Sequence, residues 1–330
     1  MRIRIAALSI ILLLGFRAFS QQGPVADHHQ HLGSPEIVKL AATSTRPPVP
    51  IIAKDLVALL DASGIQRALV FSAAYVYGSP ARTVEDEYAK VRAENDWTGA
   101  QAALYPKRLR AFCSFNPLKD YALAELERCA KDPNLKHGLK LHFSNSDVQL
   151  DNPAHVEQLA RIFSAANKHR MAIVIHMPGS IARQRPSNGT HASRVLGAAQ
   201  AQVFLEKLLP LVPKIDIQIA HLAGNGAGYD SAVADKAFAV LAEAIEKNDP
   251  RTRRLWFDFT TSVTPNISPA DAALVVKRIR QVGAKRVLYG SDAPAPPNLT
   301  PRDWWAAFRK LPLTESEFNQ IARNVAPYLR

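Results

Sequence analysis

Residues 25–31 read VADHHQH, and this short stretch decides between the two folds that the rest of the sequence allows. Short apolar runs alternate with longer segments of helical periodicity, which is the pattern of a parallel β-sheet covered by helices. An open, doubly wound sheet that binds a dinucleotide has a glycine-rich phosphate turn after its first strand. Here the acidic, histidine-rich residues 27–31 take that position, so the sequence favours a closed barrel.

The remaining apolar runs supply the other strands of that barrel. Helical boundaries separate them, because residues 53–63 end at Gly64 and residues 151–169 begin with a capping residue and Pro153. Eight strand and helix pairs in about 300 residues suit a single (β/α)8 TIM barrel, whose active site lies at the C-terminal ends of the strands. The predicted strands span residues 25–31, 67–72, 110–115, 138–142, 172–176, 216–221, 255–259 and 286–289.

The first twenty residues have the pattern of a signal peptide. Two arginines precede an apolar run over residues 5–16, and small residues follow before Gln21. The sequence therefore predicts a signal peptide over residues 1–20 and an exported protein, periplasmic or secreted, whose barrel domain spans residues 21–330. The apolar run is shorter than the roughly 20 residues of a membrane span. We expect no stable membrane insertion after cleavage, with an uncleaved anchor as the alternative.

The charge of the chain is basic but dispersed. There are 41 lysines and arginines against 29 acidic residues, a formal net charge of +12. Nucleic-acid surfaces gather basic residues on one face or along one helix. Basic residues here occur singly or in short groups, so we predict no nucleic-acid partner. A local positive field can still draw anionic small molecules toward a cleft.

The two cysteines are too few for a disulfide framework, even in an oxidising compartment. Cys129 lies on the apolar stripe of a predicted helix, and Cys113 lies in the preceding strand. We expect two buried thiols, with a disulfide between them as the alternative.

Metal-ligand residues stand where otherwise apolar runs end. His29 and His31 end the first run, and residues two apart in a strand point to the same face. Two later runs end in His176 and His221, and Asp292 follows the last run. A single histidine at a strand end is more often a hydrogen-bonded core or surface residue than a ligand. All five positions fall on the same rim, however, and three imidazoles with a carboxylate can hold a divalent ion and leave room for water.

Several motifs resemble the amidohydrolase superfamily, in particular the amidohydrolase-2-like branch that contains aminocarboxymuconate-semialdehyde decarboxylase and related lactonases. The resemblance extends along nearly the whole chain after the predicted signal peptide. The matching motifs are Asp27-x-His29-x-His31-Leu32, Asn95-Asp96-Trp97, Phe115-Asn116-Pro117, Gly138-Leu139-Lys140-Leu141-His142, Ala220-His221-Leu222-Ala223-Gly224, Leu288-Tyr289-Gly290-Ser291-Asp292-Ala293-Pro294 and Ile321-Ala322-Arg323-Asn324-Val325-Ala326.

The resemblance implies a site that holds one zinc or similar ion, with manganese as an alternative. It assigns His29, His31, His176 and Asp292 to the metal and His221 to catalysis. Some superfamily members hold two ions bridged by a carboxylated lysine, and Lys140 lies on the corresponding strand. Other relatives work without a metal. The sequence favours one ion over two.

Basic residues near the rim predict a substrate that carries a carboxylate. Lys140 and His142 share a strand face, and Arg183 and Arg185 lie in the long segment after His176. Arginine suits a carboxylate because its planar donors can grip both oxygens. A buried ion pair for Lys140, and solvent exposure for the two arginines, are the structural alternatives. The proline-rich residues 294–297 are expected to form a rigid rim.

The reaction that these residues favour is hydrolysis of an ester, lactone or amide bond in a small molecule. A divalent ion lowers the pKa of water and polarises a carbonyl. Asp292 would take the proton from water, and His221 would stabilise the oxygen on which charge develops. The same scaffold in relatives supports non-oxidative decarboxylation of a small unsaturated or aromatic acid, which is the second interpretation. An exported binding protein without turnover is the third, and a homo-oligomer is compatible with each.

Overall fold

The computed structural model describes residues 23–41, 49–177, 197–224, 226, 228–229, 231–293 and 299–330. The predicted signal peptide, Arg183, Arg185 and the proline-rich residues 294–297 lie outside the described residues.

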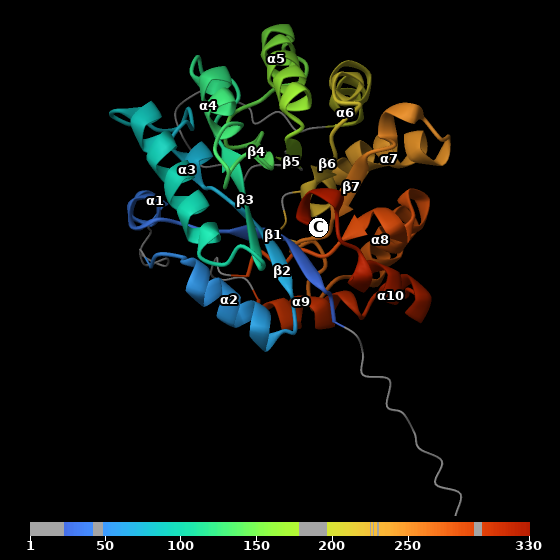
Figure 1. The fold of residues 1–330 in the computed structure, drawn as a ribbon. Helices are drawn as coiled ribbons and strands as arrows, with labels where there is room; N and C mark the ends of the chain where they lie inside the picture. Colours follow the sequence, from blue (N-terminus) through green and yellow to red (C-terminus); the bar gives the residue numbers. More distant parts are fainter. Residues whose placement is uncertain are drawn as a thin grey trace, which may run out of the picture.

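Eight parallel strands follow one another in chain order around a nearly closed barrel, as the sequence predicts (Figure 1). Neighbouring strands pair in parallel from the first to the eighth, and β4 runs in register with β5 over five residue pairs. The strands are β1 (Ala26–His31), β2 (Arg67–Phe71), β3 (Leu109–Ser114), β4 (Gly138–His142), β5 (Ala172–His176), β6 (Ile217–Ile219), β7 (Leu255–Asp258) and β8 (Val287–Leu288).

The last strand meets the first through backbone hydrogen bonds beyond the end of β8. The N–H of His28 donates to the carbonyl of Tyr289 at 2.8 Å, and the N–H of Asp292 donates to the carbonyl of His29 at 2.8 Å. The second bond fixes Asp292 beside the histidine-bearing strand. Gly290 allows this approach, because a Cβ at that position would lie 2.7 Å from the Cβ of His29.

Helices surround the strands in a ring (Figure 1). Polar caps start several of them: Asn152 accepts from the N–H of Ala154, and Ser268 accepts from the N–H of Asp271. The helices are α1 (Pro35–Ala41), α2 (Ala53–Ala62), α3 (Glu87–Ala103), α4 (Ala122–Cys129), α5 (Pro153–His169), α6 (Ala198–Val203), α7 (Ser231–Glu246), α8 (Pro269–Val282), α9 (Pro301–Phe308) and α10 (Glu315–Arg323). Shorter helical turns are η1 (Ala74–Val76), η2 (Phe204–Leu208), η3 (Leu209–Leu211), η4 (Ala220–Ala223), η5 (Pro250–Thr252), η6 (Ala284–Arg286) and η7 (Pro327–Leu329).

Apolar side chains fill the barrel below the site. Phe71 and Phe112 are fully buried and pack with Val174 in a cluster that also contains Tyr328 and Leu329 from the C-terminal turn. The C-terminus accordingly lies at the centre of the ring of strands in Figure 1. Because the floor is packed with these side chains, the open end of the barrel is the one toward which the strands run.

The structure corrects the expectation of two free thiols. Cys113 in β3 and Cys129 in α4 form a disulfide, and both side chains are fully buried. The strand and the helix that follows it are adjacent layers of the barrel, so their facing positions bring the two sulfurs together. In the described residues, no helix is both long and apolar enough to cross a membrane.

Candidate active site

Five histidines from four neighbouring elements gather at the mouth of the barrel. Ring centroids lie 5.5 Å apart for His29 and His31, 4.6 Å for His29 and His221, and 4.7 Å for His176 and His221. The ring of His142 stacks on that of His176 at 3.9 Å. Strand alternation accounts for this, since His29 and His31 lie two apart on one face of β1, and His142 and His176 end β4 and β5. We call His29, His31, His142, His176 and His221 the mouth histidines.

Asp258 at the end of β7 orients His29. Its Oδ2 lies 3.2 Å from His29 Nδ1, and both side chains are buried. Asp258 also accepts hydrogen bonds from Gln218 Nε2 at 2.5 Å and from the backbone N–H groups of His221 and Thr260 at 3.0 and 3.1 Å. Burial alone would raise the pKa of Asp258, but the charge and hydrogen bonds of its donors hold this pKa well below its usual range.

An ionised carboxylate accepts only, so it fixes the tautomer of His29. Nδ1 carries the hydrogen, and the lone pair of Nε2 points into the barrel mouth. Burial and the positive charge of Lys140 lower the pKa of His29 to about 3, against the opposing effect of Asp258. His29 is therefore neutral over the physiological range and presents an available nitrogen.

His221 presents the same nitrogen for a different reason. Its Nδ1 lies 2.8 Å from the carbonyl oxygen of Thr260, which can only accept, so Nε2 is again the lone-pair nitrogen. Burial lowers the pKa of His221 and favours the neutral form. Gly226 packs so closely against this ring that a Cβ on residue 226 would lie 2.5 Å from His221 Nδ1.

The backbone at His221 makes a left-handed turn. His221, Leu222 and Ala223 have φ values of 54°, 50° and 64°, a conformation that costs roughly 1–2 kcal/mol per non-glycine residue. The turn is held by the bond from the N–H of His221 to Asp258 and by a 2.8 Å bond from the N–H of Gly224 to the carbonyl of His221. Backbone strain of this kind concentrates at functional sites.

His142 has the opposite tautomer. The backbone N–H of Asn145 donates to its Nδ1 at 3.1 Å, so Nε2 carries the hydrogen. The ring lies between His176 on one side and Tyr75 on the other, whose centroid is 4.7 Å away. His142 is thus a neutral hydrogen-bond donor in a fixed orientation.

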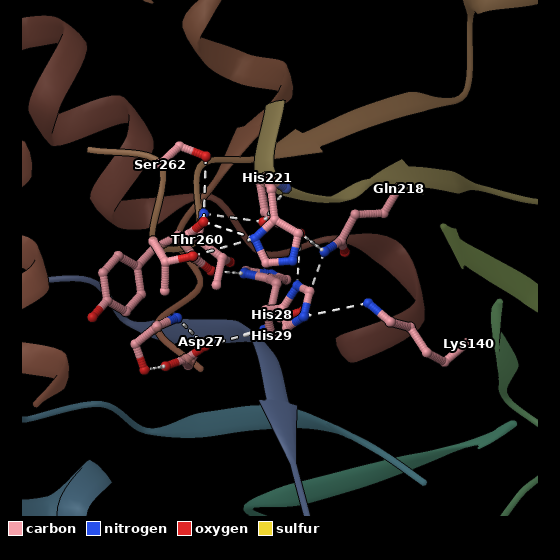
Figure 2. A network of polar contacts seen from close by, with 12 residues as sticks. Asp27, His28, His29, Lys140, Gln218, His221, Thr260 and Ser262 are labelled. Atoms are coloured by element: carbon pink, nitrogen blue, oxygen red, sulfur yellow. Dashed lines mark hydrogen bonds and ion pairs between the residues drawn. The ribbon is translucent and has the colours of Figure 1, made fainter. Parts of the chain in front are cut away.

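Lys140 is fully buried in the same mouth. Its Nζ lies 3.3 Å from His29 Nε2 and 4.5 Å from the centroid of the Phe71 ring (Figure 2 shows the first contact). Burial lowers the pKa of Lys140 to about 8, although the negative charges of Asp258 and Asp292 oppose this effect. The ammonium group therefore rests on an imidazole and an aromatic face.

Asp292 stands at the seam between the last strand and the first. It has a φ of 52°, and its backbone N–H holds the carbonyl of His29. Burial, with a contribution from the negative charge of Asp292, raises the pKa of Tyr75 above the usual range. The ring of Tyr75 contacts those of His31 and His142, so Tyr75 lies at the same mouth as Asp292. All the predicted site residues that the structure describes lie there. Arg183 and Arg185 lie outside those residues.

The chemistry of these side chains fits a divalent transition-metal ion. Neutral imidazoles with inward Nε2 lone pairs, one of them held by a carboxylate on its other nitrogen, are the arrangement found around such ions. The spacing is wider than a bound ion requires. Among the described residues, the one group of three ligand atoms within 4.8 Å of one another is that of Cys113, Glu125 and Cys129, whose two cysteines form the disulfide.

His28 belongs to the frame of the barrel. Its Nδ1 donates to the carbonyl of Tyr289 at 3.0 Å, and its Nε2 accepts from the N–H of Ala326 at 3.2 Å. Asp27 beside it accepts from Gln30 and Ser291 at 2.6 Å each. These contacts connect the first strand to the C-terminal part of the chain.

Asp258 ends the seventh strand, where the sequence indicates that it could reach the site or orient a ligand, and the structure places it against His29. Sequence reasoning missed two other residues that shape the site. Gln218 is a polar residue inside an apolar run, which is a signal of a buried polar function. Tyr75 lies in η1 after β2, where nothing in the local sequence separates it from an ordinary loop tyrosine.

Solved structures with the same fold cover nearly the whole chain. A 5-carboxyvanillate decarboxylase from Sphingomonas paucimobilis has a TM-score of 0.62 at 17% identity, over 91% of this chain and 96% of that one. A dihydroxybenzoic acid decarboxylase from Polaromonas sp. JS666 with bound manganese and 2-nitroresorcinol has a TM-score of 0.58 at 15% identity, over 91% and 95%. A protein described as a 2-pyrone-4,6-dicarboxylic acid hydrolase, from Acinetobacter baumannii, has a TM-score of 0.54 at 15% identity, over 91% and 96%.

These likenesses establish the barrel fold. No protein with a curated description matches the chain significantly. The family model for amidohydrolases, in contrast, matches residues 26–326, a range that contains every strand of the barrel and all five mouth histidines. The chain therefore belongs to the amidohydrolase family.

Proposed function

We propose that this protein is a metal-dependent hydrolase that cleaves an ester, lactone or amide bond in a small substrate bearing a carboxylate. The observation that carries the proposal is the pair of inward lone pairs on His29 and His221, each fixed by an acceptor on the other ring nitrogen. Such fixed, neutral imidazoles can bind an ion or accept a proton without further rearrangement.

The metal would be held by His29, His31, His176 and Asp292. Zinc is our first choice, and manganese, which the Polaromonas structure contains, is the alternative. When bound, the ion would lower the pKa of water and polarise the carbonyl under attack.

Asp292 and His221 would move the proton. A carboxylate at the end of β8 can accept a proton from the attacking water and deliver it to the leaving group. His221 accepts through Nε2 in the tautomer that Thr260 imposes, so it would stabilise a developing negative oxygen as an imidazolium that has first taken up a proton from solvent. That proton returns to solvent when the product leaves, whereas the proton of the attacking water passes through Asp292 to the leaving group.

The substrate would be held by His142 and Lys140, with Arg183 and Arg185 proposed as further anchors. The Nε2–H of His142 suits a carbonyl or carboxylate oxygen, because the bond from Asn145 prevents the ring from presenting a lone pair there. The ammonium of Lys140 supplies a positive charge in a buried setting, where its attraction for an anion is strong. We therefore expect an acidic substrate.

Non-oxidative decarboxylation is the second candidate. The observation that favours it is that the similar structures from Sphingomonas and Polaromonas are decarboxylases. A buried cation beside a proton donor could hold a carboxylate and protonate the carbon that loses it. Hydrolysis and decarboxylation are separable by experiment, because only decarboxylation releases carbon dioxide.

Labelled water separates the two reactions. Purified protein would be incubated with lactones, amides and aromatic acids in ¹⁸O water, and products would be analysed by mass spectrometry together with released carbon dioxide. We expect the label in the product and no carbon dioxide. Stoichiometric carbon dioxide without label in the product would replace hydrolysis by decarboxylation.

Metal content tests the site itself. The purified protein should bind about one equivalent of zinc or manganese, and the double variant His29→Ala/His31→Ala should bind none. Full occupancy in the double variant would refute the assignment.

Export is the location that we propose. The buried disulfide supports it, because such bonds persist mainly in oxidising compartments such as the periplasm or the extracellular space.

A further inference from the structure

The ammonium of Lys140 lies among the mouth histidines. Lys140 is in the middle of β4 with its side chain directed into the barrel, and none of its surface is exposed. Burial lowers the pKa of each mouth histidine, and the positive charge of Lys140 lowers each of them further. One buried cation therefore acts on all five rings.

The contact with His29 is direct and uses the nitrogen that a metal would need. Lys140 Nζ stands 3.3 Å from His29 Nε2. The other nitrogen of this ring is held by Asp258, which itself has four hydrogen-bond donors around it. His29 can therefore offer a single lone pair, and that lone pair already accepts from an ammonium group.

We infer that Lys140 and the metal ion are alternative occupants of His29 Nε2, so that an ion binds only when the lysine side chain has moved off the ring. This inference rests on the proposed metal-dependent function. It accounts for the spacing of the site, because among the described residues no three atoms of the mouth histidines and carboxylates lie within 4.8 Å of one another. While the ammonium group of Lys140 occupies this position, the histidine rings surround the lysine. The rings can converge on an ion only after the ammonium group has moved away.

The displaced ammonium stays inside the barrel, because the lysine is anchored to the middle of a strand. The negative charges of Asp258 and Asp292 both favour the charged form of this lysine by raising its pKa against the effect of burial. A divalent ion and an ammonium in one buried mouth repel each other, and repulsion is strong where water is excluded. Lys140 thus lowers the affinity of the site for metal, and an anionic substrate group would relieve the repulsion.

Removing the ammonium should strengthen metal binding. Lys140→Met keeps an unbranched, flexible side chain of nearly the same length but removes the charge, the donor and the ammonium contact with the Phe71 ring. We expect zinc to bind the metal-free variant about 10- to 100-fold more tightly than the unmodified protein, the worth of one hydrogen bond to a charged group. The measurement is competition of zinc with a chromogenic chelator.

A matched variant controls for net charge. Lys119→Met also removes one lysine, whose Nζ pairs with Glu87 at 2.7 Å outside the site, and should leave zinc affinity unchanged. Equal or weaker zinc affinity in Lys140→Met than in the unmodified protein would overturn this inference but not the proposed metal-dependent function. If neither protein binds zinc, both the inference and the proposed function fail.

Two further measurements keep the test decisive if Lys140→Met does not fold. Lys140→Gln retains a neutral donor to His29 and should bind zinc more tightly than the unmodified protein. In unmodified protein labelled with ¹⁵N, zinc should shift the resonances of His29 Nε2 and Lys140 Nζ together, at the same equivalence point. A lysine resonance that does not change while the histidine binds zinc would contradict the inference.

Discussion

Hydrogen bonds to the backbone and to carboxylates decide which nitrogen each mouth histidine presents. His29 and His221 show a lone pair to the barrel, whereas His142 shows an N–H. Three side chains of one type therefore have two different roles in a single site. At the scale of the residue, function depends on the neighbour on the far side of each ring.

Asp292 has two proposed tasks that make different demands on its side chain. As a ligand it needs an oxygen near the ion, and as a base it needs a charge that can accept a proton. Asp292→Asn should therefore fold and keep some metal, yet lose on the order of 10²- to 10⁴-fold in kcat. Metal content and kcat would be measured on the same samples, with folding checked by circular dichroism.

His221→Asn provides the comparison. It should also keep its metal, because His221 lies beside the proposed ligands. Near-normal kcat with full metal in Asp292→Asn would remove Asp292 as the base and make His221 the next candidate.

Asp258 should matter for metal affinity without touching the ion. In Asp258→Asn an amide replaces the ionised acceptor, so the ring of His29 loses the partner that fixes its tautomer. We expect metal affinity to fall about 10- to 100-fold, the usual effect of losing such a partner. Asp216→Asn, just before β6, is the control, since Asp216 contacts Trp256 and Arg254 away from the mouth. Equal losses in both variants would indicate general destabilisation instead.

The sequence predicts the strand-end histidines well, because their spacing of two and the apolar runs before them are local signals. It indicates that Asp258 could reach the site, but it cannot identify His29 as the partner of Asp258, since these residues are 229 positions apart in the chain and meet only when the barrel forms. The disulfide was only the alternative to two free thiols for a related reason: the sequence shows that both cysteines lie in apolar surroundings, but it does not show that β3 and α4 bring them face to face. The sequence also cannot predict the contact of Lys140 with His29, because it forms only when β4 and β1 are both in place.

At the scale of the element, boundaries depend on single residues. Helix α5 is followed by its C-cap Arg170, an exposed arginine with a φ of 57° whose N–H bonds to the carbonyl of Ala166. Glycine is the usual residue at such a left-handed helix end, because it has no Cβ.

Arg170→Gly should raise the free energy of unfolding by about 1 kcal/mol, through relief of this conformation. Urea denaturation measures the change. Arg170→Ala removes the same charge but keeps a Cβ, so it should show no gain. A similar gain in the alanine variant would assign the effect to charge.

Helix α10 begins with a capping box in which the Glu317 side chain accepts a hydrogen bond from the N–H of Thr314 at 2.7 Å. The same carboxylate also accepts from Nε of Arg280, on α8, at 2.9 Å. The hydrogen bond from Arg280 and that from the Thr314 backbone lower the pKa of Glu317 to about 2. A depressed carboxyl pKa stabilises the fold above the unfolded value and loses this contribution as the pH falls. The contribution should therefore be complete above about pH 4.5 and disappear toward pH 2.

Glu317→Gln should lower stability at pH 6 and have a smaller effect at pH 3. Urea denaturation of both proteins at each pH would show this. A difference between the two proteins that does not depend on pH would mean that the charge of Glu317 contributes nothing.

At the scale of the whole molecule, the disulfide ties two layers of the barrel across a loop of 16 positions. A crosslink of this length stabilises a fold by about 3 kcal/mol, mainly by restricting the unfolded chain. Denaturation with and without reductant should show a loss of this order on reduction. Cys113→Ala/Cys129→Ala should be insensitive to reductant, and an unmodified protein that is equally insensitive would show that the bond contributes no stability.

The seam and the floor of the barrel have a consequence for how the chain is made. The first strand is held by Tyr289, Ala322 and Ala326, and the interior beneath the histidines is sealed by Tyr328 and Leu329. A ribosome synthesises these residues after all eight strands, so a growing chain carries an open, unfinished barrel until they have emerged. The barrel can therefore close only late in synthesis, and its eight strands must remain incompletely packed until then.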